Sequence, residues 1–325
     1  MIALRELTKR YGGSTAVHEL TLDVAAGRVT GFLGPNGAGK STTMRMILGL
    51  DHPSHGTALI DGKPYAALRH PLREVGALLD AKAVHPARTA RSHLLAQARS
   101  NGIPVRRVDE VLETVGLAKA ARRRTGSYSL GMYQRLGVAG ALLGDPPTLV
   151  LDEPVNGLDP DGVRWMRQLV RGQAAQGRTV FLSSHLMSEM QLTADHLVVI
   201  GRGRLLADTP MAAFLAGGAR PSVRVEVPDP EERAVLVSRL AAETDVTVEV
   251  QETPRAAGTA GTAGAVLVRG RSAAHVGDLA HRHGVRLHQL SDVQVSLEQA
   301  YVELTARSVE YVTGGEQHEH HHDHA

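Results

Sequence analysis

The sequence has no cysteine, few aromatic residues and few lysines. Without cysteine the chain has no disulfide, no thiol chemistry and no cysteine-ligated metal site. Aromatic residues make up only 3% of the chain, and only five of its 36 basic residues are lysines. Because lysine is so scarce, any lysine that lies inside a recognisable motif stands out.

Long apolar runs are also missing. No stretch reaches the roughly 18–20 apolar residues that a membrane-spanning helix needs, and the first residues, MIALRELTKRYGG, lack the apolar centre of a signal peptide. The sequence therefore predicts a chain that stays in the cytoplasm. The net charge of +2 is too small to indicate a nucleic-acid partner.

The length and composition indicate an ordinary globular protein of two domains. A chain of 325 residues exceeds one small domain. Hydrophobic residues are 42% and charged residues 22%, enough to bury a core. This composition excludes disorder as the main state, and it also excludes a collagen-like chain.

Short apolar runs alternate with helical patterns over the first two thirds of the chain. The expected strands are rich in Val, Ile, Leu or Thr and are bounded by Gly, Asp or Pro. They are Ile2–Leu7, Leu20–Val24, Val29–Leu33, Ala58–Asp61, Leu149–Asp152, Val180–Ser183 and Leu197–Ile200. Helices are expected at Lys40–Leu50, Gly162–Gln176 and Met187–Asp195. The alternation predicts an α/β domain over residues 1–215, with a largely parallel sheet covered by helices.

A helical insert interrupts this alternation at about residues 86–144. No convincing strand lies there, and helical spacing appears at Leu94–Ser100, Arg107–Val115 and Leu130–Leu143.

A Gly/Pro-containing linker at Ala216–Pro221 precedes a second domain, predicted over residues 222–306. Its expected elements are the strands Ser222–Val227, Val246–Gln251, Ala265–Arg269 and Val285–Leu290, with the helices Glu231–Glu243, Ala273–His283 and Ser296–Ala306. The β-α-β-β-α-β order predicts a small α+β domain of ferredoxin-like topology, with another small α+β fold as the alternative. The segment AAGTAGTAGA is expected to be a flexible loop. The His-rich tail, residues 314–325, is expected to be disordered, with weak binding of Zn²⁺ or Ni²⁺ as the alternative.

A glycine-rich phosphate-binding motif lies between an expected strand and an expected helix, which is the context that such a motif requires. It comprises Gly34, Pro35, Asn36, Gly37, Ala38, Gly39, Lys40, Ser41 and Thr42. The glycines let backbone N–H groups surround a phosphate chain, and the N-terminus of the helix adds partial positive charge. Lys40 would reach the β- and γ-phosphates, and the Ser41 hydroxyl would bind Mg²⁺. The alternative is a glycine-rich turn that binds nothing, and the motif alone specifies a nucleoside triphosphate but not its role.

Two adjacent carboxylates, Asp152 and Glu153, end the apolar run Leu149–Leu151. Neighbouring side chains of a strand point to opposite faces, so the two acids need not share one task. Asp152 suits the Mg²⁺ shell, and Glu153 suits a general base that activates water for attack on the γ-phosphate. Two surface acids at the end of a strand are the alternative.

Together with further motifs in the right order, these residues resemble the nucleotide-binding subunits of ABC transporters. Tyr128-Ser-Leu-Gly-Met132, followed by Gln134 and Arg135, stands where that family has its LSGGQ signature. Asn156-Gly-Leu-Asp159 resembles its D-loop, and Ser183-Ser-His185 resembles its switch histidine. The resemblance covers about residues 1–214 and implies an ABC cassette that binds and hydrolyses ATP with Mg²⁺.

The resemblance assigns roles to the remaining site residues. Tyr11 stands where the family has an aromatic that stacks on adenine, and His185 where an imidazole contacts the γ-phosphate. Ser129 opens a helix, so its hydroxyl and the Gly131 amide can face an anion. The alternatives are a packed turn tyrosine, a polar strand end and a plain N-cap serine.

Two motifs depart from the family pattern. Asp80 stands where a Gln is usual; an acid can hold Mg²⁺ or a water, but its charge differs. Leu130 and Met132 replace the first Gly and the Gln of the signature. Both departures resemble the bacterial drug- and antibiotic-efflux branch, and the C-terminal domain, which ends in residues 296–305, resembles the extension found there.

In the family that the sequence resembles, ATP is held between the phosphate loop of one subunit and the signature of another. The resemblance therefore implies that a chain with one of each forms a homodimer with two shared ATP sites. The resemblance also implies a separate membrane permease, contacted by the helical insert and the Asp80–Pro86 loop, and a place on the inner face of the membrane. The predicted function is an ATPase subunit that powers export of a drug, an antibiotic or a similar molecule. The alternatives are a soluble ABC ATPase in translation or DNA repair and a small-molecule kinase. The missing second cassette argues against the first of these, and the signature and switch histidine argue against the second.

Overall fold

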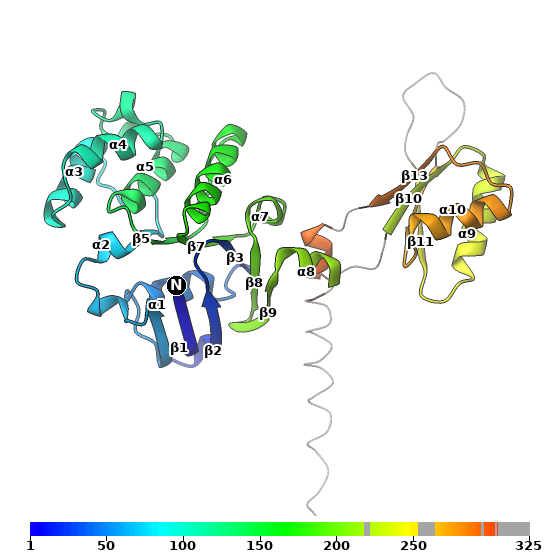
Figure 1. Cartoon of the computed structure of the whole chain (residues 1–325), viewed down its shortest axis with the longest axis horizontal. Coiled ribbons are helices and arrows are strands. Elements are labelled where there is room, and N and C mark those ends of the chain that lie inside the picture. The colour runs from blue at the N-terminus through cyan, green and yellow to red at the C-terminus, as the bar shows by residue number, and fades with distance from the viewer. Residues whose placement is uncertain (218–221, 253–263, 294–295, 303, 305–325) are drawn as a thin grey trace, which may run out of the picture. The chain divides into compact units, whose positions relative to one another are not determined.

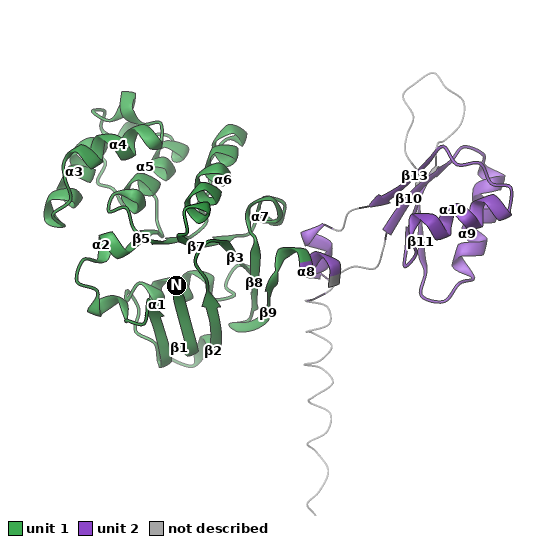
Figure 2. Cartoon of the chain, in the orientation of Figure 1, with its two compact units in different colours: residues 1–212 green, residues 213–325 purple. Residues whose placement is uncertain are grey.

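The computed structural model describes residues 1–217, 222–252, 264–293, 296–302 and 304. The chain divides into two units, Met1–Ala212 and Ala213–Ala325, which Figure 2 colours separately. Within the described residues, no helix combines the length and the apolar character needed to cross a membrane.

A six-stranded sheet lies at the centre of the first unit, in the order β5-β6-β7-β3-β8-β9 (Figure 1). Its strands are β3 (Val29–Leu33), β5 (Val75–Leu78), β6 (Thr148–Leu151), β7 (Thr179–Ser184), β8 (His196–Gly201) and β9 (Arg204–Pro210). Every neighbouring pair is parallel except β8 with β9. Strands β3, β6 and β7 are buried along their whole length, as expected for strands of a parallel sheet that is covered on both faces.

A second, antiparallel sheet has the order β2-β1-β4 and shares a core with the central sheet. Its strands are β1 (Ile2–Tyr11), β2 (Ser14–Val24) and β4 (His55–Ile60). β1 continues beyond the predicted end at Leu7 because it stays paired with β2 as far as Tyr11, opposite Ser14. Phe32 and Phe181 of the central sheet pack in the shared core with ring centroids 5.0 Å apart.

Helices of the first unit cover the sheets and form the predicted insert. Helices α1 (Lys40–Ile47), α6 (Pro160–Ala175) and α7 (Met187–Thr193) follow strands of the central sheet, and α2 (Pro71–Glu74) precedes β5. The insert consists of α3 (Ala90–Ser100), α4 (Arg106–Thr114) and α5 (Leu130–Leu142), which gather at the β5 side of the unit in Figure 1. Short 3₁₀ turns lie at Tyr65–Ala67, Ala118–Ala120 and Thr125–Ser127. The prediction of a helical insert is confirmed.

The second unit has a four-stranded antiparallel sheet in the order β11-β12-β10-β13. Its elements are β10 (Ser222–Val227), α9 (Pro230–Ala241), β11 (Thr247–Glu252), β12 (Gly264–Arg269), α10 (Ala273–Arg282) and β13 (Gln289–Val293), after α8 (Met211–Gly217). Valines of β10 and β12 pack against leucines of α9 and α10 in a core of its own. This topology is the predicted ferredoxin-like one.

The predicted strand Val285–Leu290 is wrong in its position, because β13 begins at Gln289. Helix α10 ends with Gly284 in the left-handed region, at φ 68°, and the Val285 amide donates to the Ala280 carbonyl at 2.9 Å. This is the hydrogen-bond pattern of a Schellman helix end. Val285 therefore closes the helix and is buried in the core instead of starting a strand.

Several predictions fall outside the described residues. They include most of the Ala216–Pro221 linker, most of the Gly/Ala/Thr loop and the His-rich tail. Of the predicted final helix, residues 297–302 and 304 are helical.

Candidate active site

The phosphate-binding loop joins β3 to α1, as the sequence predicts. Gly39 precedes α1 with φ 103°, and a Cβ built there would lie 2.5 Å from the carbonyl oxygen of Ala16. Only glycine fits that space and that backbone angle. The loop is therefore fixed against β2, and the free amides of the first turn of α1 face the position that a phosphate would take.

Lys40 lies buried inside the loop. Its Nζ donates to the carbonyl of Gly34 at 2.6 Å and to that of Pro35 at 3.2 Å. Burial lowers the pKa of the Lys40 ammonium, while the carboxylates of Glu153 and Asp152 act in the opposite direction. The cation thus stands at the centre of the loop, opposite the two acids.

Both acids follow β6, and each has a different partner. The Ser183 hydroxyl, at the end of β7, donates to Oδ1 of Asp152 at 2.5 Å and accepts the backbone N–H of Glu153 at 2.9 Å. The Glu153 carboxylate turns instead to His185, whose Nδ1 lies 2.8 Å from its Oε2. This separation matches the expectation that neighbouring residues at the end of a strand do different work.

The Glu153–His185 pair lies at the surface of the site. The His185 side chain is 47% exposed and that of Glu153 is 21% exposed. An exposed imidazole held by a half-buried carboxylate can orient a water or contact an anion, and the carboxylate can accept a proton. The structure therefore brings together Lys40, Asp152, Glu153 and His185, as the sequence predicts.

The signature begins α5. Ser129 is its N-cap, and its hydroxyl accepts the amide of Met132 at 3.3 Å. Ser129 and its neighbour Leu130 are both exposed. The N-cap alternative is thus met in the structure, and an exposed N-cap hydroxyl beside the first-turn amides remains available to an anion.

Leu130, the departure from the signature, packs on the D-loop of the same chain. A Cβ built at Gly157 would lie 2.2 Å from Cδ2 of Leu130. The bulky side chain therefore needs a glycine opposite it. Asp159 ends the D-loop as the N-cap of α6, where its Oδ1 accepts the Gly162 amide at 2.8 Å.

Tyr11 ends β1 with its ring exposed. Its hydroxyl donates to Oδ2 of Asp51 at 3.0 Å, and Nζ of Lys9 lies 4.9 Å from the ring centroid. Arg45 of α1 pairs with Asp51 at 2.8 Å. The ring is held at its hydroxyl end, and it is 49% exposed with the Lys9 ammonium over it.

Asp80 lies just beyond β5 and is exposed. Its Oδ1 accepts the backbone amide of Lys82 at 2.8 Å, which stabilises the local turn. No contact between the Asp80 side chain and the phosphate-binding loop is found in the described part of the chain. The structure thus gives Asp80 a turn-forming contact and does not join it to the other acids.

Three site residues were not assigned a role from the sequence. Ser183 and Gln134 lie inside recognised motifs, and Asp51 carried no signal. Ser183 joins both acids, Asp51 holds Tyr11, and the buried Gln134 amide donates to the Glu153 carbonyl at 3.1 Å. Their motif positions marked the first two as candidates, but only the folded structure shows their partners.

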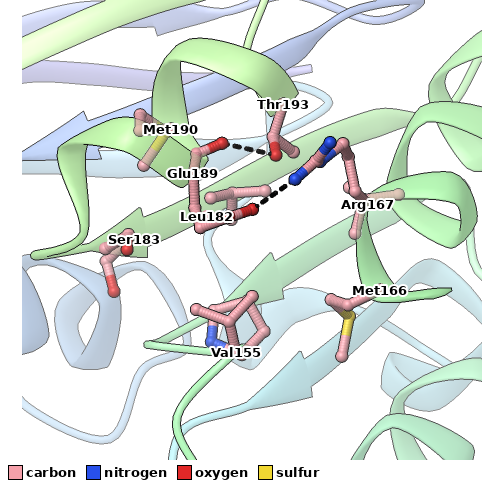
Figure 3. Close-up of a pocket in the computed structure, with 11 residues that line it drawn as sticks. Val155, Met166, Arg167, Leu182, Ser183, Glu189, Met190 and Thr193 are labelled. Carbon is pink, nitrogen blue, oxygen red and sulfur yellow. Dashed lines mark hydrogen bonds and ion pairs between the residues drawn. The ribbon is translucent and has the colours of Figure 1, made fainter. Parts of the chain in front are cut away.

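A small cavity lies beyond the D-loop, between β7, α6 and α7 (Figure 3). Its volume is about 20 Å³, and Val155, Met166, Leu182 and Met190 give it a mainly apolar lining. Arg167 closes one side through an ion pair with Glu189 at 2.6 Å. A space of this size excludes a nucleotide, so this cavity is not a nucleotide site.

The fold and the site together define a P-loop nucleotide hydrolase. Residues 17–156 match the family model of the ABC transporters, and residues 221–298 match a domain of unknown function. A bacitracin transport ATP-binding protein of Bacillus licheniformis is 43% identical over 213 residues, which cover 65% of this chain and 70% of that protein. The Nod factor export ATP-binding protein I of Burkholderia orbicola (strain AU 1054) is 36% identical over 254 residues, covering 76% and 84%.

A solved ATP-binding subunit of an ABC transporter has the same fold. It aligns with a TM-score of 0.61 and 26% identity, over 67% of this chain and 92% of that structure. The chain belongs to the ATP-binding family of the ABC transporters, as its motifs indicated. It is therefore an ATPase whose hydrolysis is coupled to transport.

Proposed function

We propose that this chain powers the export of an antibiotic or a similar molecule through a separate membrane permease. The observation that carries the proposal is the Glu153–His185 pair, set opposite a buried Lys40 in the phosphate-binding loop. The similarity of this chain to a bacitracin transport ATP-binding protein favours an antibiotic as the transported molecule. Such a subunit works in the cytoplasm, at the inner face of the membrane.

The loop from Gly34 to Thr42 fits a triphosphate. Loop amides and the Lys40 ammonium supply donors and positive charge, and phosphate oxygens would replace the carbonyls of Gly34 and Pro35 as acceptors of Lys40. The Ser41 hydroxyl and the Asp152 carboxylate supply the oxygen ligands that Mg²⁺ prefers. A bound Mg²⁺ would neutralise charge on the phosphates. Asp80 would join this set only by giving up its bond to the Lys82 amide.

Hydrolysis is assigned to Glu153, which accepts a proton from the attacking water. His185 holds Oε2 of Glu153 and offers its other ring nitrogen to the γ-phosphate. Tyr11 stacks on adenine through its exposed ring. Because charge develops on the transferred phosphoryl group, fixed donors around it contribute most of the rate.

A homodimer completes each site. The exposed Ser129 hydroxyl and the Gly131 amide, at the start of the 13-residue helix α5, would contact the ATP held by the partner subunit. A two-fold axis then gives two equivalent sites, each with the loop of one subunit and the signature of the other. Leu130 would lie at this contact because its side chain is 46% exposed beside the D-loop.

The permease is proposed to dock at a groove between the helical insert and the turn after β5. The groove has a volume of about 210 Å³, and it is lined by Asp80, Ala83 and Val84 with His93 of α3 and Leu136 of α5. An apolar surface with a few polar groups suits a short amphipathic segment of a membrane partner.

A soluble ABC ATPase that acts in translation or DNA repair is the less favoured alternative. The net charge of +2 gives no basis for nucleic-acid binding, and the relatives named above are transport and export proteins. A small-molecule kinase is the other alternative. An assay of phosphate release from ATP distinguishes the two, because an ATPase releases phosphate without any acceptor molecule and a kinase needs one.

The Glu153→Gln variant tests the proposed function. Removing the general base is expected to slow ATP hydrolysis by roughly 10²–10⁴-fold. Binding should survive, so ATP should hold this variant as a dimer in size-exclusion light scattering. Glu113→Gln, at an exposed position of α4, is the matched control and should behave as wild type. A Glu153→Gln protein that stays monomeric with ATP, or that hydrolyses at the wild-type rate, would contradict the proposal.

A further inference from the structure

Glu153 has an unusual backbone. Its φ is 49°, in the left-handed region that residues with a Cβ rarely adopt. Such a conformation is strained and persists only when the surrounding structure fixes it. The position of the proposed base therefore depends on whatever holds this residue.

Both backbone polar groups of Glu153 are held from distant segments. Its N–H donates to the Ser183 hydroxyl of β7 at 2.9 Å, and its carbonyl accepts Nε2 of Gln134 from α5 at 3.1 Å. Ser183 is fully buried and Gln134 is 5% exposed. Because burial shields these bonds from water, they restrain the residue more firmly than surface bonds would.

Gln134 does more than avoid an unpaired buried carbonyl. The backbone N–H of Asn156 already donates to the same Glu153 oxygen at 3.1 Å. That bond joins residues only three positions apart, so it moves together with the turn and does not fix the turn in place. The Gln134 bond is the one that ties this carbonyl to the helical insert, so it fixes the turn relative to α5.

We propose that Gln134 is a positioning residue for ATP hydrolysis. Its amide, together with the Ser183 hydroxyl, holds the Glu153 backbone so that the carboxylate stays on His185 and faces the phosphate-binding loop. The inference rests on the proposed role of Glu153 as the general base. Because Gln134 lies on the helix that Ser129 begins, a shift of α5 also shifts the base.

The test uses the full-length chain with Gln134→Met, which keeps the side-chain length and removes the donor. We expect kcat to fall roughly 10–100-fold, because a misplacement of about 1 Å can cost that much. The KM for ATP and the affinity for a fluorescent ATP analogue should stay within twofold of wild type. A general loss of structure would change binding as well as kcat.

A double-mutant cycle separates positioning from an independent effect. If Gln134 acts through Glu153, adding Gln134→Met to Glu153→Gln should change the residual rate less than twofold. Rates that multiply in the double variant, or a wild-type kcat for Gln134→Met, overturn the inference. A Glu153→Gln protein with wild-type activity would instead overturn the proposed function, so the two failures are distinct.

Gln134→Glu gives a second readout and decides the matter if Gln134→Met loses nucleotide binding. A protonated carboxyl at this site can donate to the Glu153 carbonyl, whereas an ionised one repels it. The kcat of Gln134→Glu relative to wild type should therefore rise as the pH falls from 8.5 to 6. A relative kcat that stays at the wild-type level over that range overturns the inference.

Discussion

At the scale of single residues, the hydroxyl of Tyr11 ties the ring that we propose stacks on adenine to Asp51. Asp51 also pairs with Arg45, one turn beyond the phosphate-binding loop on α1. The hydrogen bond from Arg45 is the main cause that lowers the pKa of the Asp51 carboxyl. Asp51 is therefore ionised at neutral pH, and the tether does not depend on pH near neutrality.

Asp51→Ala should weaken ATP binding by roughly 3- to 10-fold, because the Tyr11 ring loses a hydrogen bond that fixes its position before adenine binds. The kcat should change little, since the tether lies away from the reacting phosphate. Equilibrium titration with a fluorescent ATP analogue measures the effect.

Tyr11→Phe is the matched control for that titration. It keeps the ring and removes the hydroxyl, so it should weaken binding by the same factor, and combining it with Asp51→Ala should add nothing. Effects that multiply in the combined variant would contradict the tether.

Individual site residues were predictable where they lie within a short motif. Lys40, Asp152 and Glu153 follow strands that the apolar runs reveal, so the local pattern was sufficient. Asp51 could not be predicted as a partner of Tyr11, because 40 residues separate them and only the folded chain brings the turn after α1 to the end of β1. The same holds for Ser183 and Gln134, whose motif positions gave no indication that both contact the backbone of Glu153.

At the scale of elements, α3 carries His93 into the groove beside the turn after β5. Burial lowers the pKa of the His93 imidazole, and the Arg88 guanidinium lowers it further. The unfolded chain then binds more protons than the folded one as the pH falls below about 6.5, the ordinary value for histidine. The free energy of unfolding therefore decreases as the pH falls below about 6.5.

His93→Gln should reduce this loss, because glutamine does not titrate. We expect the free energy of unfolding, measured with urea at pH 7.5 and at pH 5.5, to fall less in the variant than in the wild type. His283→Gln, at the exposed C-terminal end of α10, serves as the control and should leave the difference unchanged. An equal fall in wild type and His93→Gln would contradict the account.

Element type was predicted for β3, β6, β7 and β8 of the parallel sheet but not for β5, the short strand at its edge, and element ends were not predictable. Helix α1 stops at Ile47, short of the predicted Leu50, because the Leu50 amide bonds back to Arg45 in the same Schellman pattern that ends α10. Strand β9 was not predicted because it lies at the edge of the sheet, where exposed and half-buried residues mix and no apolar run forms. These ends depend on local hydrogen bonds that hydrophobic spacing does not encode.

At the scale of the whole molecule, two units with separate cores divide the chain. The first has a core shared by its two sheets, and the second has valines and leucines of its own between sheet and helices. The chemistry assigned here lies entirely in the first unit. We propose that this unit transmits ATP hydrolysis to a membrane permease through the groove beside Ala83.

Recovery of the tagged full-length chain from detergent-solubilised native membranes tests that claim most directly, with mass spectrometry of what accompanies it. The account predicts a multi-span membrane protein in near-equal amount. Ala83→Glu, which places a charge in the exposed part of the groove, should lose this partner, and Ala175→Glu, at the exposed end of α6, should keep it. Ribosomal or DNA-repair proteins with no membrane partner would contradict the account.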